Sequence, residues 1–301
     1  MAPCGSVLSR AENFIWLTAR VLEQRRFAYD FLDGDPGAVE TALDAYRNSD
    51  GGYGHALDPD LRGPVSQPLH TAAAVRILDS IGRCAGQRVE RIGRYLTAVS
   101  TPEGALPAVH PSLRGCPAAP WFPVVDTPPG DLLATGPVVG ALHRNNVWHA
   151  WLFRATDYCW SAVESLGKTH PYEVRAALAF LEGVPDRPRA EAAAERLGTL
   201  VREQRLVVTD PDRRADLPLP SGYAPGEYHY PTDFARAPRS PARRWFSDVE
   251  LERALDHLVG RQRDDGGWDL DRHHWAPGTA LEGRPRVTLE ALHTLRAYGR
   301  L

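Results

Sequence analysis

Apolar and polar residues alternate with a helical period along nearly the whole chain. Amphipathic helices are predicted over 12–31, 39–47, 88–99, 148–166, 190–204 and 248–261. The stretches 69–78, 132–142 and 287–298 carry small or apolar residues on several sides, which is typical of buried helices, and 172–181 forms a pair with 148–166. No series of residues alternates with the period of two that a strand requires, so the pattern predicts an all-α protein.

A short phrase recurs near the two ends of the chain. It is Asp-Gly-Gly-Tyr at 50–53 and Asp-Gly-Gly-Trp at 265–268, and Pro-Glu-Gly-Ala-Leu-Pro at 102–107 stands where a further copy is expected. Glycine after the last turn can adopt a positive φ and end a helix, and the aromatic residue can pack between neighbouring units. We therefore interpret the glycines of this phrase as structural rather than catalytic.

Repeated helix pairs either form an open solenoid or close on themselves. Because the two best copies lie near opposite ends of the chain, closure would make them neighbours. We predict a single domain, 1–301, that is an α/α toroid (barrel) of about five to six helix pairs, with 69–78, 132–142 and 287–298 among the inner helices.

The same residues resemble a known superfamily. Gln-x-x-Asp-Gly-Gly-Trp at 262–268, followed by Val-Thr-Leu-Glu-Ala-Leu at 287–292, is similar to the repeat of the terpenoid cyclases and protein prenyltransferases (the prenyltransferase and squalene oxidase repeat). The stretch 67–75 resembles the loop-to-inner-helix junction of that repeat. The chain looks like a single-domain bacterial member, and the resemblance implies a toroid around a deep, aromatic-lined cavity.

The functional motifs depart from that superfamily. Class II cyclases use an Asp-x-Asp-Asp acid, whereas the nearest strings here, at 58–60, 210–212 and 269–271, are each one aspartate short. Prenyltransferase β subunits hold zinc with Asp, Cys and His, and no cysteine here stands in that context. An Asp-Asp-x-x-Asp diphosphate motif does not occur. The resemblance therefore favours the fold more strongly than an activity.

Bulk composition excludes several classes of function. Of 301 residues, 43% are hydrophobic and 24% charged, so a full core is expected and disorder is not. The net charge is −3 and no basic stripe contains aromatic residues, so nucleic acid is an unexpected partner. Neither a signal peptide nor a transmembrane stretch is recognisable. The four scattered cysteines, Cys4, Cys84, Cys116 and Cys159, indicate reduced thiols in a cytoplasmic protein.

The first candidate site lies in and beside the loop after the first Asp-Gly-Gly phrase. It comprises His55, Asp58, Asp60 and His70, with Tyr53 as a substrate contact. Two neighbouring carboxyl groups can have different pKa values, and one can then stay protonated as a general acid. The alternative is that 58–60 is only a turn and His70 a packing residue.

The second candidate site occupies the equivalent place after the second phrase. Its residues are Trp268, Asp269, Asp271, His273, His274, Trp275 and Glu282. Asp271 with one histidine could form an acid–base pair. Adjacent histidines on an extended segment point to opposite sides, so we do not expect both to reach one site. The alternative is a solvated loop.

The third candidate is a long, Gly- and Pro-punctuated segment that would supply a lid or a binding surface. Its residues are Tyr223, Tyr228, His229, Tyr230 and Asp233, and Trp121 in an earlier Pro-rich loop is a further predicted substrate contact. Aromatic side chains could line a cavity for a carbocation, serve as a sugar platform, or simply pack.

These features favour a terpene cyclase-like enzyme without a cofactor. It would act on an isoprenoid or similarly apolar small molecule by acid-initiated cyclisation or isomerisation, so isomerase and lyase chemistry are both possible outcomes. A carbohydrate-active α/α-barrel hydrolase or lyase and a non-catalytic binding module are the alternatives, because fold alone does not determine function. The substrate and the oligomeric state are left open.

A zinc site is not predicted, because no cysteine has a partner at ligand spacing. We expect elemental analysis of the purified protein to find far less than one zinc per chain. A value near one zinc per chain would contradict this and would favour a prenyltransferase-like centre.

Overall fold

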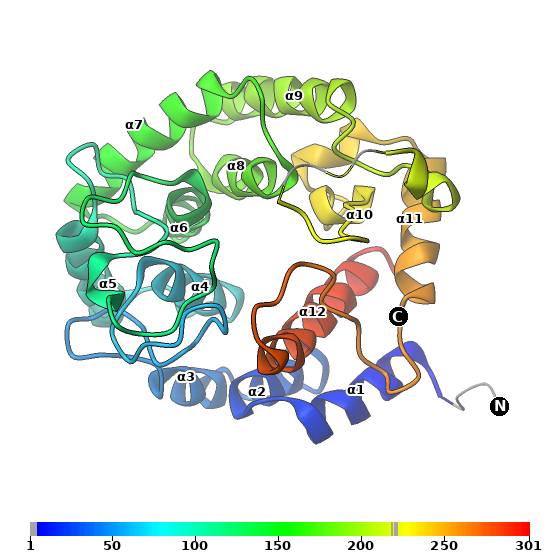
Figure 1. Ribbon diagram of the computed structural model, residues 1–301, viewed down its shortest axis with the longest axis horizontal. Coiled ribbons are helices and arrows are strands. Elements are labelled where there is room, and N and C mark those ends of the chain that lie inside the picture. Colours follow the sequence, from blue (N-terminus) through cyan, green and yellow to red (C-terminus); the bar gives the residue numbers. More distant parts are fainter. Residues whose placement is uncertain (1–4, 218, 220–221) are drawn as a thin grey trace. The chain divides into compact units, whose positions relative to one another are not determined.

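The computed structural model describes residues 5–217, 219 and 222–301, and over these residues the regular structure is helical (Figure 1). Strands are absent from the described residues, where only two isolated β-bridges occur. The predicted all-α class is confirmed. The helices are α1 (Val7–Thr18), α2 (Val21–Phe31), α3 (Pro36–Asp44), α4 (Pro68–Ser80), α5 (Gly86–Val99), η1 (Pro111–Leu113), α6 (Leu132–Arg144), α7 (Ala150–Ser165), α8 (Pro171–Gly183), α9 (Arg187–Glu203), η2 (Pro211–Asp216), α10 (Pro231–Phe234), η3 (Pro241–Trp245), α11 (Asp248–Gly260) and α12 (Pro277–Ala297).

The chain divides into two compact units. Unit 1 contains Met1–Asp35 and Glu195–Leu301, and unit 2 contains Pro36–Ala194. The second boundary falls within α9, so the chain passes between the units once in a loop and once in a helix. Unit 1 is therefore built from both ends of the chain.

In unit 2 the helices that were predicted to be inner lie at the centre of the packing. Helix α6 packs against α4, α7 and α8, and it has buried residues on several sides, among them Ala134, Val138 and Leu142. Helix α5 instead buries one face, which includes Ile92 and Leu96, and exposes charged residues on the other. The predicted roles of 69–78 and 132–142 as inner helices and of 88–99 as an outer helix are confirmed.

In unit 1 the C-terminal helix α12 packs against α1, α2 and α11. Their shared core includes Phe14 from α1, Leu292 from α12 and Trp268 from the second Asp-Gly-Gly phrase. The side chain of Gln262 donates to the carbonyls of Val7 and Gly266, both at 2.9 Å. The second phrase thus joins the two ends of the chain, as its position in the sequence suggested.

The repeated phrase makes the same backbone turn three times. Gly51, Gly104 and Gly266 have φ of 91°, 89° and 91°, a region in which side chains with a Cβ are strained. A Cβ on each would overlap the next outer helix, which is α5, α7 and α1 respectively. The phrase at 102–107 is therefore a true copy, and each glycine allows a turn to contact a neighbouring helix directly.

A threonine hydroxyl on the following inner helix completes each copy. The hydroxyl oxygen accepts the backbone N–H two residues after the turn glycine. The three bonds run from Tyr53 to Thr71 (3.1 Å), from Leu106 to Thr135 (2.9 Å) and from Trp268 to Thr288 (3.0 Å). All three threonines are buried, so each bond is shielded from water and holds a turn at the start of an inner helix.

The predicted single helix over 12–31 is in fact two helices, α1 and α2. The hydroxyl of Thr18 bonds back to the carbonyl of Phe14 at 2.7 Å, and Ala19 and Arg20 are extended. Such local side-chain bonds compete with helix continuation. The apolar period carried on through the break, because both helices bury their apolar faces in the same core.

Helix α12 begins ten residues before the predicted start at 287. The helix continues through Pro285, as α6 does through Pro137. The carbonyl that loses its partner belongs to Leu281, which is 67% exposed and therefore accessible to water. Although α12 has 21 residues, none of the described helices is long and apolar enough to cross a membrane.

We predict that Gly266→Ala destabilises the protein by about 3 kcal/mol or more, because it adds a steric overlap with the backbone of α1 to the cost of a positive φ. Gly299→Ala is the matched control: its φ is also positive, at 68°, but a Cβ there meets no atom within 4 Å. The control should lose only about 1–2 kcal/mol in urea unfolding. Equal losses for the two variants would contradict the proposed contact.

Candidate functional site

The loop after the first Asp-Gly-Gly phrase is a series of tight turns. His55 and Ala56 both have left-handed backbones, with φ of 54° and 56°. Each such residue costs about 1 kcal/mol or more and persists only when its surroundings hold it. The ring of His55 contacts Asn48 at 2.9 Å, so this exposed histidine is engaged within its own turn.

The structure brings Asp58, Asp60 and His70 together. The carboxylate of Asp58 accepts the backbone N–H of Asp60 at 3.0 Å, and His70 Nε2 lies 3.3 Å from the carbonyl oxygen of Asp58. Asp60 is 2% exposed and His70 is fully buried on the first turn of α4. Three of the four residues of the first candidate site therefore form one polar group, in which Asp60 and His70 are buried and Asp58 is half-buried.

A second loop, residues 106–126, covers this group. The carbonyl of Asp60 accepts the N–H of Ala119 at 2.8 Å, and the buried side chain of Gln67 accepts the N–H of His110 at 2.9 Å. Burial lowers the pKa of His110. Trp121 belongs to the covering loop and is 40% exposed. Its predicted contact with a substrate stays a prediction.

Tyr53 and Trp268 form the core of the repeat, which corrects the prediction that they contact substrate. Tyr53 is 0% exposed and its hydroxyl accepts from Arg88 at 3.3 Å. Trp268 is 1% exposed and its indole N–H donates to the carbonyl of Leu258 at 2.8 Å. Both side chains are enclosed and their polar atoms are satisfied internally.

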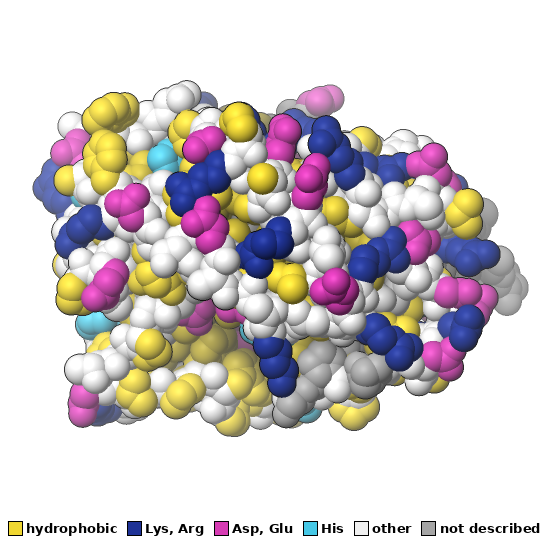
Figure 2. All heavy atoms as spheres, turned by 90° about the horizontal axis from the view of Figure 1, so that it is seen from above, with side chains coloured by type: hydrophobic (Ala, Val, Ile, Leu, Met, Phe, Trp, Pro, Cys, Tyr) yellow, Lys and Arg dark blue, Asp and Glu magenta, His cyan; other side chains and the backbone are white. Residues whose placement is uncertain are grey.

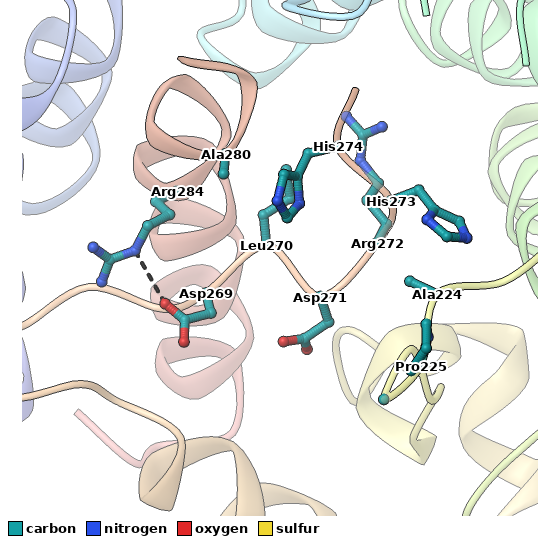
Figure 3. A pocket seen from close by; sticks show the side chains of 11 residues that line it. Ala224, Pro225, Asp269, Leu270, Asp271, Arg272, His273, His274, Ala280 and Arg284 are labelled. Atoms are coloured by element: carbon teal, nitrogen blue, oxygen red, sulfur yellow. Dashed lines mark ion pairs between the residues drawn. The ribbon is translucent and has the colours of Figure 1, made fainter. Parts of the chain in front are cut away.

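The second candidate site opens onto a hollow of about 650 Å³ in unit 1 (Figure 3). Residues 269–274 form one wall, and Ala280 and Arg284 of α12 form another. Residues 224–226 of the long third segment complete the lining. Parts of the second and third candidate sites therefore share one hollow, as expected of loops that bind a common ligand.

Arg284 organises the carboxylates on the α12 side of the hollow. Its guanidinium makes two bonds to Asp265, at 2.7 and 2.8 Å, and reaches Asp269 at 3.2 Å. It also lies over the ring of Phe14, 4.7 Å from the centroid. The hydrogen bonds from Arg284 lower the pKa of Asp265. The predicted contact Asp269 is thus held in a charged network that also fixes the repeat turn.

Asp271 forms an ion pair with Arg261, and its role as the acid–base partner of a histidine stays a prediction. Both His273 and His274 are among the residues that line the hollow. The chain bends at Arg272 instead of staying extended, and Figure 3 shows the two rings on opposite sides of the backbone.

The remaining residues of the second candidate site lie outside the lining of the hollow. Glu282 was expected in a loop but belongs to α12, because that helix begins at Pro277. Trp275 is half-buried just before the helix. The sequence pattern predicted this helix only from residue 287, so both residues were expected to precede it.

Most of the third segment packs into the protein rather than into the hollow. Tyr230 is 6% exposed and its ring lies 4.5 Å from that of His257, while Tyr228 packs against the same cluster. Asp233 accepts the N–H of Tyr230 at 2.8 Å, and His229 is 7% exposed. Burial raises the pKa of Tyr230 and lowers that of His257. These side chains stabilise the segment.

The part of this segment that reaches the hollow is the turn at 224–226. Its conformation is held by Glu227, whose buried carboxylate accepts the N–H of Ala224 at 2.8 Å. Tyr223, just before the turn, packs edge-on against His229 with ring centroids 5.8 Å apart. The segment therefore supplies small side chains and backbone to the hollow, not the predicted aromatic lining.

Unit 2 contains an acidic residue that the sequence analysis did not select. Asp131 caps α6, with its carboxylate accepting the N–H of Leu133 at 2.7 Å and its own N–H donating to Leu106 at 2.9 Å. Burial raises the pKa of Asp131, against the effect of the bond from Leu133. Glu173 raises it further and His170 lowers it.

The neighbours of Asp131 come from α7 and α8. His170 caps α8 and Glu173 lies in its first turn, where it accepts the hydroxyl of Thr169 at 2.7 Å. Burial and the charge of Asp131 raise the pKa of Tyr158 to about 12. Asp131 was not selected as a site residue from the sequence, because an aspartate before an apolar helix is expected as a cap. Asp131 could have been selected as a candidate because the helix that it caps was predicted to be an inner helix.

The described residues contain no group of three His, Cys, Asp or Glu side chains arranged to hold a metal ion. Cys84, Cys116 and Cys159 are free thiols, and burial raises the pKa of Cys84 to about 12. Cys4 lies outside the described residues.

The chain is similar to terpene cyclases in sequence and in fold. No family model matches it. Over 243 residues it is 28% identical to drimenyl diphosphate synthase of Streptantibioticus cattleyicolor, an alignment that covers 77% of this chain and 41% of that protein. The chain thus spans about two-fifths of the length of this curated relative.

Three solved structures resemble the chain over nearly its whole length. A protein from Actinoplanes matches with a TM-score of 0.60 and 16% identity, over 97% of this chain and 98% of that one. The type II terpene cyclase MstE from Scytonema matches with a TM-score of 0.55 and 12% identity, over 98% and 88%. A variant of MstE in complex with geranylgeranyl dihydroxybenzoate, its substrate, gives 0.52 and 13%, with the same coverage. In fold the chain resembles type II terpene cyclases, as its repeat predicted.

We predict that Asp131→Asn gains stability relative to the wild type as the pH rises. A carboxyl whose folded pKa is raised stabilises the fold fully below its unfolded value, near 3.8, and loses that stabilisation as the pH rises through the folded pKa. Asparagine keeps the cap but cannot ionise. Urea unfolding between pH 3.5 and 8 measures the difference, with Asp157→Asn on the exposed face of α7 as control. A difference that does not change with pH would contradict a raised pKa.

Proposed function

We propose that this protein is a terpene cyclase-like enzyme that isomerises an open-chain isoprenoid by acid-initiated cyclisation. The observation that carries the proposal is the fold, which matches over 98% of the chain that of a type II terpene cyclase with an isoprenoid substrate complex. The sequence similarity to drimenyl diphosphate synthase supports the same class. We also propose that the two units act as one α/α-barrel domain.

The reaction requires a proton donor that is shielded from water. Protonation of an alkene forms a C–H bond from the π electrons and leaves a tertiary carbocation, which the next double bond captures with formation of a ring. We assign the donor to the group formed by Asp58 and Asp60, with His70 beside the loop backbone. The burial of Asp60 supports this assignment, because a carboxyl group removed from water holds its proton more strongly.

We propose that the hollow in unit 1 is by itself a binding site for a small molecule. Its lining is mixed, with apolar Leu270 and Ala280 beside polar Arg272, His273 and His274. A lining of both kinds suits a molecule with a hydrocarbon chain and a polar head. Because Asp269 and Asp271 are ion-paired with arginines, we propose that they position the loop instead of donating protons.

The test of this function uses purified protein and open-chain polyenes: farnesyl diphosphate, geranylgeranyl diphosphate and geranylgeranyl dihydroxybenzoate. An isomerisation conserves mass, so we expect a product of the same mass as the substrate with fewer double bonds, detected by chromatography and mass spectrometry. A ligand that shifts the melting temperature without product formation would favour the binding module. If none is bound or converted, the proposal fails.

We predict that Asp58→Asn and Asp60→Asn each lower turnover by about 10²-fold or more, the usual contribution of a general acid, with little change in melting temperature. Asp212→Asn is the matched control, because it alters the Asp-Pro-Asp string at 210–212, where Asp212 is exposed. Full turnover in both loop variants, or unfolding of both, would show that the acid assignment is wrong.

A further inference from the structure

Deprotonation must end a cyclisation that begins with a proton, and the base that accepts this proton decides which alkene is released. We propose that Asp131 is this base, at the start of the inner helices α6 and α8, with His170 and Glu173 beside it. The inference rests on the proposed function and assigns a residue outside the three sites selected from the sequence.

The packing of α6 against α8 places these residues together. A Cβ on Gly136 would meet the carbonyl of Ala176, and one on Gly140 would overlap that of Ala179. Both contacts join residues about 40 positions apart in the same order, so the two helices run parallel and in backbone contact. When this offset of about 40 residues is continued to the N-termini of the two helices, Asp131 lies beside His170, the residue that precedes α8.

The repeat supports the assignment of Asp131 through the position that this residue occupies before its inner helix. Asp131 lies four residues before Thr135, the threonine that holds the turn at 104–106. Arg284 lies four residues before Thr288, its counterpart in the second phrase, and Arg284 lines the hollow in unit 1. The equivalent place on the inner helix α12 is therefore one from which a side chain lines a hollow.

The surroundings favour acceptance of a proton. The charged or titratable groups that act on Asp131 are Glu173 and His170 from α8, and Tyr158 from α7. Burial and, to a smaller extent, Glu173 strengthen proton binding at Asp131, whereas the N–H of Leu133 and His170 weaken it. This contrasts with Asp265 and Asp269, whose oxygens are bound by Arg284.

The step is balanced without a co-reactant. The C–H bond next to the cationic carbon breaks, its electron pair forms the new C=C bond, and the proton binds an oxygen of Asp131. One proton enters at the start and one leaves at the end, so the substrate is isomerised. His170 can then receive the proton from Asp131 and release it to water.

The first test compares the products of wild type, Asp131→Asn and Asp157→Asn on the polyene panel. We expect Asp131→Asn to consume substrate within about threefold of the wild-type rate while the native alkene falls at least tenfold, a loss in the range of acid–base groups. Other alkene isomers, or an alcohol formed when water captures the carbocation, should replace it. Asp131→Glu should partly restore the native product, and Asp157→Asn should match the wild type.

An unchanged product from Asp131→Asn would overturn the inference while leaving the proposed function intact. Loss of all consumption at an unchanged melting temperature would also overturn it, because Asp131 would then donate the first proton. If Asp131→Asn does not fold, the product of Asp131→Glu decides, since a displaced carboxylate should alter the alkene ratio.

A second test does not depend on turnover. An isoprenoid tertiary amine, protonated at neutral pH, mimics the carbocation, and its neutral hydrocarbon analogue is the control. Asp131→Asn should weaken binding of the amine about tenfold and leave binding of the hydrocarbon unchanged, because only the amine is attracted to the carboxylate. Equal affinity of wild type and variant for the amine would overturn the inference even if no polyene is converted.

Discussion

The structure depends on one junction, in which a glycine turn contacts the next outer helix and a buried threonine holds the turn to an inner helix. It occurs at Gly51, Gly104 and Gly266, each with φ near 90°. The turn must approach another backbone without a Cβ between them, which only glycine permits. Because the threonine lies on the inner helix, the bond also sets where that helix begins relative to the turn. The junction therefore determines which residues the helix presents at its first turn.

In this junction the residue that holds the turn is different from the residue that sets the local charge. The residues four positions before the three threonines are Gln67, Asp131 and Arg284: a neutral amide, an acid and a cation. Gln67 is bonded to the covering loop, Asp131 caps its helix, and Arg284 holds Asp265 and Asp269. The same backbone geometry thus supports three different local charges. Substitution at these positions can change the site without disturbing the bond that fixes the turn.

The repeat could be recognised from the sequence because the residues that form it have to meet strict geometric requirements. The copies at 50–53 and 265–268 share the sequence Asp-Gly-Gly-aromatic, whereas the copy at 102–107 shares only the glycine. This third copy was therefore recognised only from its spacing relative to the predicted helices. Helix boundaries were harder to predict where the structure departs from the usual local preferences of the sequence. Pro285 should end a helix but is tolerated in α12, and the break at Ala19 lies in an uninterrupted apolar period. Packing against a shared core decided both cases.

Site residues were predicted less well than the fold, because the same residue types serve packing and chemistry. Tyr53, Trp268 and Tyr230 were selected as aromatic residues near loops, and all three are buried. Asp131 was passed over because a capping aspartate needs no functional explanation. What distinguishes it is its environment: the aspartates of the second phrase are bound by arginines, whereas Asp131 lies beside a carboxylate and a histidine. A carboxyl group matters for acid–base chemistry through its neighbours, and neighbours brought from α7 and α8 are visible only after the helices have packed.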